Sequence, residues 1–316
     1  MVIPTYRRPF LLTKCLCALA DQCFEKSDYE IIVVSDGPDA DTFGVVKQWL
    51  DEHGLPVHYR PLAEKKGPAA CRNAGWKQAK APLIAFTDDD CIPADNWLAS
   101  IMKEYQGARY AVYTGKVCVP ISDQPTDYER NVACLETAEF VTANCICTRA
   151  ALEWVNGFDE RFRTAWREDS DLHFKFLKAD VPIRRIEATV VHPVRKARWG
   201  VSIVEQRKNV YNALLYKKHP VLFRQRIKPS PSWHYYLMVL LFMAMLTAIA
   251  GGSDLLALAT LASWLILLLA FIKKRMKNTS KKRSDLLEII ITSVLIPFIS
   301  VYWNLYGALK FRVVFL

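Results

Sequence analysis

Along the first 200 residues, short apolar runs alternate with longer segments in which apolar residues recur every three or four positions. The short runs are rich in β-branched residues and end at turn signals such as Ser35-Asp36-Gly37-Pro38, which is typical of buried strands. The longer segments, 10–19 and 41–50 among them, have the periodicity of amphipathic helices. The segments with a strand-like pattern are 1–3, 31–34, 57–60, 83–86, 110–119, 183–186 and 189–191.

Strands that alternate with helices at this spacing form a parallel sheet covered by helices on both faces. The sequence therefore predicts an α/β domain over residues 1–200, followed by a basic helical segment over 201–232. Ligands of such sheets bind at the carboxyl ends of the strands. Three polar clusters fall at predicted strand ends, so we expect them to line one crevice: Thr5-Tyr6-Arg7, Ser35-Asp36 and Thr87–Asp90.

The pattern changes in the membrane-like region 233–316. Segments 233–250 and 255–272 each hold 18 residues without Asp, Glu, Lys or Arg. As helices they would each span roughly 27 Å, close to the ~30 Å hydrocarbon core of a bilayer. We predict a transmembrane hairpin, with two helices buried inside a soluble protein as the alternative. A third apolar segment, 286–309, could span the membrane or lie in its interface as an amphipathic helix.

The distribution of charge indicates how the chain is oriented in a membrane and which partner it contacts. The chain carries 42 Lys and Arg against 32 Asp and Glu, a formal charge of +10. Seven of the basic residues lie in 273–284, beside the apolar segments, so we expect membrane lipid rather than nucleic acid as the partner. The positive-inside rule then predicts a multi-pass protein of the cell (inner) membrane with its N-terminal domain in the cytoplasm. Lys310 and Arg312 favour a cytoplasmic C-terminus and so disfavour a third span.

Two further features agree with a cytoplasmic domain. The N-terminal MVIPTYRRPF has no hydrophobic core of a signal peptide. The nine cysteines are scattered and have no C-x-x-C spacing, so we expect reduced cysteines in the protein core.

The acidic triplet Asp88-Asp89-Asp90 follows a buried apolar run directly. Carboxylates crowded this closely repel one another unless a cation or hydrogen-bond donors offset their charge. A divalent cation explains the triplet best, because Mg²⁺ and Mn²⁺ prefer carboxylate ligands and also take phosphate oxygens. The alternative is an acidic turn at a helix entry.

Six segments resemble family 2 glycosyltransferases of the GT-A fold, in the order in which that family has them. They are "VIPTYRRP", "EIIVVSDGPD", "GPAACRNAG", "IAFTDDDCIP", "NGFDERF" and "REDSDLHFKF". The resemblance covers roughly residues 1–195 and implies a Rossmann-like, mostly parallel sheet that binds a nucleotide-sugar donor.

The resemblance also implies residue roles. It identifies a nucleotide-sugar site at Pro4, Thr5, Tyr6, Asp36, Arg72, Asn73, Asp88 and Asp89. The sequence has Ser35-Asp36-Gly37-Pro38 where Asp-Asp-Gly-Ser is common in the family, which leaves open which position contacts the base. A surface salt bridge for Arg72 and a helix N-cap for Asn73 are the alternatives. Metal ligands, for Mn²⁺ or Mg²⁺, are Asp90, Asp88 and His192, although a lone histidine is more often structural.

The same resemblance points to an acid pair, Glu168 and Asp169, as the catalytic residues. Inverting transfer needs a carboxylate that accepts the proton of the attacking hydroxyl, which matches Asp169. We expect Asp171 at the helix surface or as a capping group. The alternative for all three acids is favourable charge at a helix N-terminus. Asn144, Trp166 and Arg167 match the acceptor side.

The leading hypothesis is a metal-dependent, inverting glycosyltransferase of glycan or polysaccharide biosynthesis, acting on a lipid-linked or membrane-presented acceptor. A polyprenyl-phosphate monosaccharide synthase is a second possibility, and an inactive scaffold of the same fold is the non-enzymatic one. A processive polysaccharide synthase is disfavoured because its Q-x-x-R-W motif is absent from the sequence.

Overall fold

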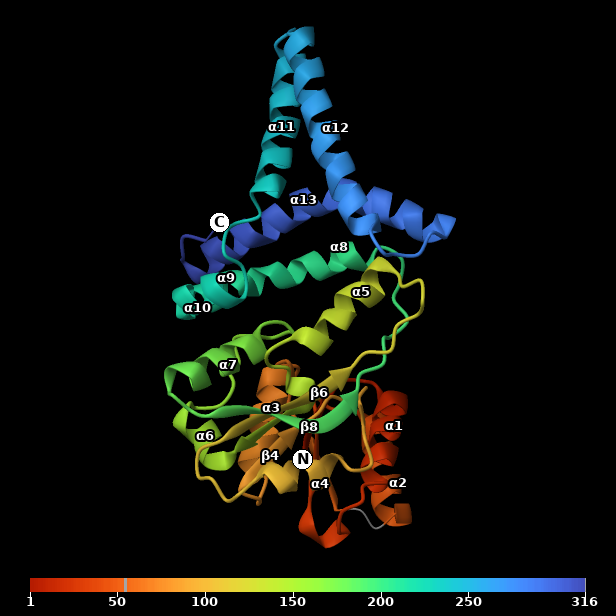
Figure 1. Cartoon of the computed structure of the whole chain (residues 1–316), viewed down its shortest axis with the longest axis vertical. Coiled ribbons are helices and arrows are strands. Elements are labelled where there is room, and N and C mark those ends of the chain that lie inside the picture. Colours follow the sequence, from red (N-terminus) through yellow and green to blue (C-terminus); the bar gives the residue numbers. More distant parts are fainter. Residues whose placement is uncertain (54–55, 316) are drawn as a thin grey trace. The chain divides into compact units, whose positions relative to one another are not determined.

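The computed structural model describes residues 1–53 and 56–315, which form two compact units (Figure 1). The N-terminal unit comprises Met1–Pro120 and Ala133–Val194. The C-terminal unit comprises Ile121–Val132 and Arg195–Leu316. The chain therefore leaves the first unit once, for a short excursion, before it passes to the second unit for good.

The N-terminal unit is built on one eight-stranded sheet with the order β3-β2-β1-β4-β7-β6-β8-β5. Strands β3, β2, β1 and β4 are parallel, β7 runs antiparallel to both of its neighbours, and β6 is parallel to β8. The sheet is thus mostly parallel, as predicted. The strands are β1 (Val2–Thr5), β2 (Ile31–Ser35), β3 (Val57–Pro61), β4 (Leu83–Phe86), β5 (Ile92–Pro93), β6 (Val112–Cys118), β7 (Cys145–Thr148) and β8 (Ile183–Val191).

Three strands differ from the prediction. Strands β5 and β7 were not predicted, and β8 is longer than expected. Residues 183–191 form a single strand, β8, instead of two short ones, because the chain stays hydrogen-bonded to β6 through an irregularity between Thr114 and Lys116. Gly115 lies at this irregularity, where a Cβ atom would come within 2.4 Å of the Ala188 carbonyl oxygen.

Helices pack on the sheet, and several begin at residues that favour a helix N-terminus. Helices α1 and α3 begin with proline, whose missing N–H is no loss in the first turn. Helix α6 is capped by the Thr148 hydroxyl, which accepts a hydrogen bond from the Ala151 N–H. The helices of this unit are α1 (Pro9–Ala20), α2 (Ala40–His53), α3 (Pro68–Gln78), α4 (Trp97–Glu104), α6 (Arg149–Trp154) and α7 (Glu168–Lys178), with 3₁₀ turns η1 (Lys26–Asp28), η2 (Cys134–Thr137) and η3 (Thr142–Asn144).

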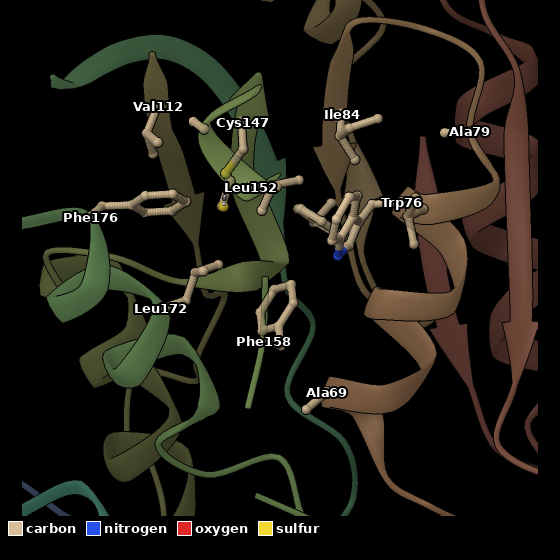
Figure 2. Close-up of a cluster of buried hydrophobic side chains, with 14 of the residues drawn as sticks. Ala69, Trp76, Ala79, Ile84, Val112, Cys147, Leu152, Phe158, Leu172 and Phe176 are labelled. Atoms are coloured by element: carbon tan, nitrogen blue, oxygen red, sulfur yellow. Dashed lines mark hydrogen bonds between the residues drawn. The ribbon is translucent and has the colours of Figure 1, made fainter. Parts of the chain in front are cut away.

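One hydrophobic cluster joins α3, α6 and α7 to the sheet (Figure 2). Phe158 packs edge-on against Phe86 of β4, with ring centroids 5.4 Å apart. Phe176 of α7 is fully buried beside Phe140. Since Phe158 and α7 belong to segments that carry candidate site residues, this core also fixes the position of the site.

The cysteines are free, but they do not all lie in the core. Cys15, Cys71, Cys91, Cys145 and Cys147 are buried as predicted. The prediction is wrong for Cys17, Cys23 and Cys134, which are exposed. Cys17 lies on α1 outside the buried face formed by Leu12, Cys15, Leu16 and Leu19, and Cys134 lies in η2, whose residues are not buried.

The C-terminal unit holds three helices long and apolar enough to cross a membrane. They are α11 (Trp233–Ala250), α12 (Asp254–Met276) and α13 (Arg283–Phe311). The alternative of buried soluble helices is wrong, because only 11% of the apolar window of α11 and 17% of that of α12 are buried. The remaining elements of the unit are α5 (Asp127–Ala133, of which Ala133 lies in the N-terminal unit), α8 (Val201–Glu205), η4 (Gln206–Asn209), α9 (Val210–Lys218) and α10 (Pro220–Arg226).

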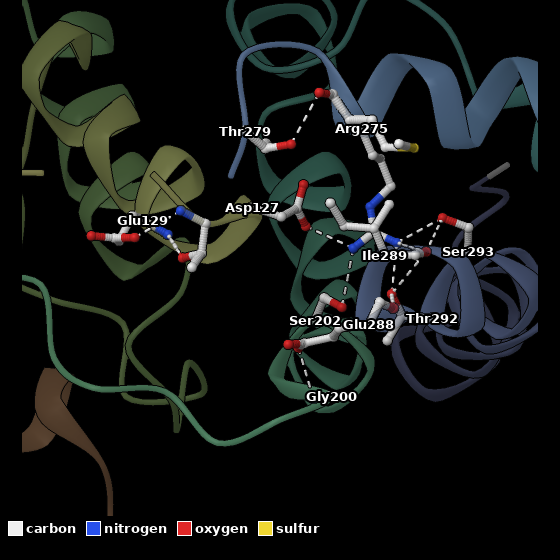
Figure 3. Close-up of polar contacts among 12 residues, drawn as sticks. Asp127, Glu129, Gly200, Ser202, Arg275, Thr279, Glu288, Ile289, Thr292 and Ser293 are labelled. Atoms are coloured by element: carbon white, nitrogen blue, oxygen red, sulfur yellow. Dashed lines mark hydrogen bonds and ion pairs between the residues drawn. The ribbon is translucent and has the colours of Figure 1, made fainter. Parts of the chain in front are cut away.

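Arg275, in the last turn of α12, joins four elements of this unit (Figure 3). Its guanidinium donates to the side chains of Thr292 and Ser293 on α13, each at 2.8 Å. It also contacts Asp127 of α5 at 2.6 Å and donates to Ser202 of α8. The excursion Ile121–Val132 is therefore held by an ion pair with the helical unit.

Replacing Phe176 with alanine tests the central cluster. Phe176→Ala should lower the free energy of unfolding by about 3–5 kcal/mol, because it removes a fully buried ring and leaves a cavity. Phe10→Ala is the control, since Phe10 is 70% exposed and its loss should change stability by less than about 0.5 kcal/mol. Thermal and chemical unfolding of the full chain in detergent, followed by tryptophan fluorescence, measures both. Equal destabilisation by the two variants would contradict this packing.

Candidate active site

The carboxyl ends of β1, β2 and β4 meet at one edge of the sheet. Thr5 lies in register with Ser35, and β4 pairs with β1 on the other side. The three predicted polar clusters follow these strands, so the topology brings them together. Both Pro4 and Thr5 lie within β1 and are buried.

Asp36 fixes the loop that leads into α3. Its carboxylate accepts hydrogen bonds from the backbone N–H groups of Lys66, at 2.6 Å, and Gly67, at 2.9 Å. Gly67 has a positive φ of 97°, and a Cβ atom there would lie 2.5 Å from the Arg163 carbonyl oxygen. Only glycine fits this position, which explains the glycine of the loop.

Tyr6 presents an aromatic ring beside two cations. The Lys65 ammonium lies 3.7 Å from the ring centroid and the Arg7 guanidinium 5.5 Å from it. An aromatic face with nearby cations suits a planar base that carries phosphates.

The carboxylates of the acidic triplet differ in their nearest partners, although the Arg8 guanidinium lies near both Asp89 and Asp90. Asp88 accepts from Arg72 at 2.7 Å, whereas Asp89 accepts from the Thr5 hydroxyl at 2.7 Å and from Arg8 at 3.2 Å. Asp90 lies 3.8 Å from the His192 imidazole. Burial raises the pKa of Asp89 to about 6, against the opposing effect of Arg8. The triplet is thus tolerated partly through donors of the chain itself.

Arg72 connects the triplet to the acid pair. Its guanidinium is 2% exposed and donates to Asp88 at 2.7 Å and to Glu168 at 3.1 Å. Burial alone would lower the pKa of Arg72, but the two carboxylates raise it, so the guanidinium stays charged. The alternative of a surface salt bridge is wrong for this residue, since the side chain lies in the interior.

The acid pair Glu168-Asp169 opens α7. Burial and the neighbouring Asp169 raise the pKa of Glu168 to about 7, although Arg72 opposes the shift. Glu168 Oε2 has no hydrogen-bond partner among the described residues. Burial also raises the pKa of Asp169, whose Oδ1 accepts from the Ser170 N–H at 2.6 Å. Both carboxyl groups are therefore set to bind a proton more readily than ordinary acids.

Asp171 is not the surface group that the sequence predicted. It is fully buried, with the Lys175 ammonium 3.7 Å away. The reason is helical spacing: Asp171 follows Glu168 by three residues, so both side chains lie on the buried face of α7.

The predicted acceptor-side residues lie in two places. Trp166 and Arg167 directly precede the acid pair, and the Arg167 guanidinium lies 4.5 Å from the Trp166 ring centroid. Arg167 has a positive φ of 74°, which turns the chain into α7. Asn144 is buried in the sheet, where its amide donates to the Lys116 and Ala188 carbonyls and accepts from Trp97. Its assignment to the acceptor stays a prediction.

Asn73 ties the turn at Gly157-Phe158 to α3. Its side-chain amide donates to the Phe158 carbonyl and accepts from the Phe158 N–H, both at 2.9 Å. The alternative of a helix N-cap is wrong, because α3 begins at Pro68 and Asn73 lies in its middle. A contact of Asn73 with a nucleotide stays a prediction.

Four side chains could hold a metal ion. One ligand atom from each of Asp88, Asp90, Cys91 and His192 lies within 4.8 Å of the others. Two carboxylates and an imidazole fit Mn²⁺ or Mg²⁺, and the thiol adds a donor that softer metals prefer. Cys91 was missed from the sequence, although its position next to Asp90 was a signal for it.

The mostly parallel sheet, with acidic and cationic groups at its carboxyl edge, has the GT-A fold. Residues 1–154 match the family described as glycosyl transferase family 2. This stretch of the chain therefore belongs to family 2 of the glycosyltransferases, as the motifs predicted.

Relatives of known name match parts of the chain. Glycosyltransferase AglE of Haloferax volcanii is 30% identical over 118 residues, which are 37% of this chain and 38% of AglE. Validoxylamine A glucosyltransferase of Streptomyces hygroscopicus subsp. limoneus is 26% identical over 270 residues, covering 70% of this chain and 57% of the relative. The chain thus spans less than two thirds of the length of either relative.

A solved structure shares the fold over nearly the whole chain. The mannosyltransferase PcManGT from Pyrobaculum calidifontis, in complex with GDP-Man and Mn²⁺, superposes with a TM-score of 0.60 at 20% identity. The match covers 94% of this chain and 86% of that one. It supports the same architecture for the chain.

The raised pKa of Glu168 predicts a pH-dependent stability. Its pKa is about 7 in the folded protein and about 4.3 in an unfolded chain, so ionisation destabilises the folded state as pH rises between these values. Glu168→Gln cannot ionise. With a chelator present, the melting temperature of the wild type should fall relative to that of Glu168→Gln between about pH 5 and pH 8. Exposed Glu187→Gln is the control, and parallel curves for wild type and Glu168→Gln would contradict the shift.

The place of Cys91 predicts binding of a soft metal. Cd²⁺ added to the full chain should produce an ultraviolet charge-transfer band of a cadmium–thiolate bond. Cys91→Ser should lose a substantial part of that band, whereas Cys147→Ser, which removes a buried thiol of β7, should retain it. An unchanged band in Cys91→Ser would show that this thiol is not a ligand.

Proposed function

We propose that the protein is a metal-dependent, inverting glycosyltransferase that moves a sugar from a nucleotide-sugar to a hydroxyl of a membrane-presented acceptor. The observation that carries this proposal is the contact of buried Arg72 with both Asp88 and Glu168. One guanidinium thereby sets the distance between the acidic triplet and the acid pair. This is the arrangement needed to hold a donor and a proton acceptor on the two sides of one anomeric carbon.

The donor would lie at the carboxyl edge of β1, β2 and β4. Tyr6, with Lys65 over its ring, would bind the nucleoside, and Asp36 would hold the loop beneath it. Asp88, Asp90 and His192, with Cys91, would hold a divalent cation, which supplies positive charge to the leaving diphosphate. The PcManGT structure, with GDP-Man and Mn²⁺ on the same fold, supports this assignment.

Asp169 would act as the general base. Burial raises its pKa, so its carboxylate takes up a proton more readily than an exposed acid does. The acceptor hydroxyl would lose its proton to this carboxylate as its oxygen attacks the anomeric carbon, and the diphosphate would leave on the opposite face. Glu168, held by Arg72, would orient Asp169 and influence its charge through their mutual repulsion.

The acceptor would be lipid-linked or presented at the bilayer, because the chain continues into helices that can cross a membrane. Trp166 and Arg167, which precede the acid pair, would contact it. The basic residues near the apolar helices favour a cytoplasmic site at the cell membrane. A polyprenyl phosphate as the acceptor would make the protein a monosaccharide–lipid synthase, which the product would reveal.

Asp169→Asn tests the base directly. Membranes that contain the full chain are incubated with Mn²⁺ and labelled nucleotide-sugars, and label is measured in the organic-extractable fraction. Asp169→Asn should lower the transfer rate by about 10²–10⁴-fold, because the amide cannot accept the proton. Binding of the nucleotide-sugar, measured separately, should remain.

Ser170→Ala is the matched control, since Ser170 only donates to Asp169. It should retain transfer within about tenfold. Normal transfer by Asp169→Asn would exclude this base. Failure of the wild type to bind any nucleotide-sugar with Mn²⁺ would favour an inactive scaffold, and label only in soluble products would exclude the lipid-linked acceptor.

A further inference from the structure

Helix α13 exposes an apolar face and buries a face that carries small and polar residues. Its exposed face is apolar and repeats at helical spacing through Leu287, Ile291, Leu295, Tyr302, Leu305 and Leu309, each more than 40% exposed. Its buried face carries small or polar residues at the same spacing, among them Ser293, Ser300, Asn304 and Gly307. A helix in a water-soluble protein would bury the apolar face and expose the polar one. The apolar face therefore requires an apolar environment outside the chain.

The buried face of α13 packs closely along η4 and α9. The Asn209 amide donates to the Ser300 hydroxyl at 3.2 Å. At Gly307, a Cβ atom would come within 2.6 Å of the Val210 carbonyl oxygen, so the two helices approach as closely as glycine allows. Figure 1 shows α13 running alongside α8 and α9, and crosswise to α11 and α12.

The helices that cover this face are charged. Between residues 205 and 218 they carry Glu205, Arg207, Lys208, Lys217 and Lys218. If α13 crossed the membrane, the layer packed along it would enter the hydrocarbon with these charges. Each charge at the bilayer centre costs about 2.5–3.5 kcal/mol or more, so a spanning α13 would be strongly disfavoured.

Two positions along α13 contact cations. In its first half, Arg275 donates to Thr292 and Ser293. At its end, the Lys217 ammonium donates to the Phe311 carbonyl at 2.7 Å. Residues 292 and 311 are 19 positions apart, so the two contacts lie about 28 Å apart along the helix. A spanning helix would place one of these cations at each membrane surface. The charged segments η4 and α9, which pack on α13 between the two contacts, would then lie inside the hydrocarbon.

The hairpin of α11 and α12 contacts the opposite side of α13. Met238, Trp264 and Leu268 of the hairpin form an apolar cluster with Val294 and Phe298. Helix α13 therefore lies between a charged layer and an apolar hairpin. Helix α13 also carries an aromatic group, in which Tyr302 and Trp303 pack against Tyr306. Such rings are enriched at the membrane–water interface.

We propose that α13 lies in the plane of the membrane interface and binds phospholipid along its Leu287–Leu309 face, so that α11 and α12 alone cross the bilayer. The lipid continues from the exposed surface of the hairpin onto the exposed face of α13. Basic side chains next to the helix would attract anionic headgroups; they are Lys273, Lys274, Lys281, Lys282, Lys310 and Arg312. Neither the sugar donor nor the acceptor enters this inference, so it is independent of the proposed function.

Membrane topology separates the two arrangements. The full chain is given an epitope either at its C-terminus or after Gly252, between α11 and α12, and protease is added to sealed vesicles of known orientation. An interfacial α13 places the C-terminal epitope on the same side as the N-terminal unit and the Gly252 epitope on the other side. A C-terminal epitope on the side opposite to the N-terminal unit would overturn the proposal.

Photocrosslinking identifies what covers the apolar face. Benzoylphenylalanine is placed at Leu295 or Leu305, and the full chain is irradiated in vesicles of phosphatidylglycerol and phosphatidylethanolamine. Both positions should give phospholipid adducts. Val204 of α8, which is 71% exposed but outside the face, is the control and should give at most about a tenth of the adduct. Adducts to protein at Leu295 and Leu305, or equal lipid labelling at Val204, would overturn the assignment of lipid to this face.

Discussion

The contact of one buried guanidinium with two separate acids is the constraint on which the site depends. Arg72 lies in α3, Asp88 follows β4, and Glu168 begins α7. A charge buried to this extent is stable only when it is paired, and breaking such a pair is strongly destabilising. The ion pairs therefore hold the three segments in one geometry, and that geometry places the acidic triplet opposite the acid pair.

The hydrophobic core and the site depend on each other. Phe158 packs on Phe86 in the core, while its backbone is hydrogen-bonded by Asn73 from α3. Asn73 is next to Arg72, so the same helix fixes the core turn and the bridging guanidinium. Burial of Glu168 and Asp169 follows from this packing and raises the pKa of both carboxyl groups. Polar residues at the candidate site thus also hold the fold together.

Much of the fold could be predicted from the sequence because its signals are local. Alternating strand and helix patterns gave the mostly parallel sheet, and runs without charge gave the helices at 233–250 and 254–276. Predictions of the burial and contacts of individual side chains were less accurate. Asp171 was expected at the surface and is buried, Asn73 lies in the middle of a helix, and Cys91 was overlooked beside the acidic triplet. Which face of α7 is buried, what the Asn73 amide binds and which side chains surround Cys91 all depend on segments distant in sequence.

By itself, the sequence determined which residue types are available and in what order, including the acidic triplet, the acid pair and the apolar helices. Only the tertiary structure decided which of these meet. It placed Arg72 between Asp88, which is 16 residues away along the chain, and Glu168, which is 96 residues away. It also decided which face of α13 is buried, because only the packing against η4 and α9 shows which side of this apolar helix faces the protein. The physical reason is the same in both cases: periodicity is encoded within one segment, but pairing and burial are properties of several segments together.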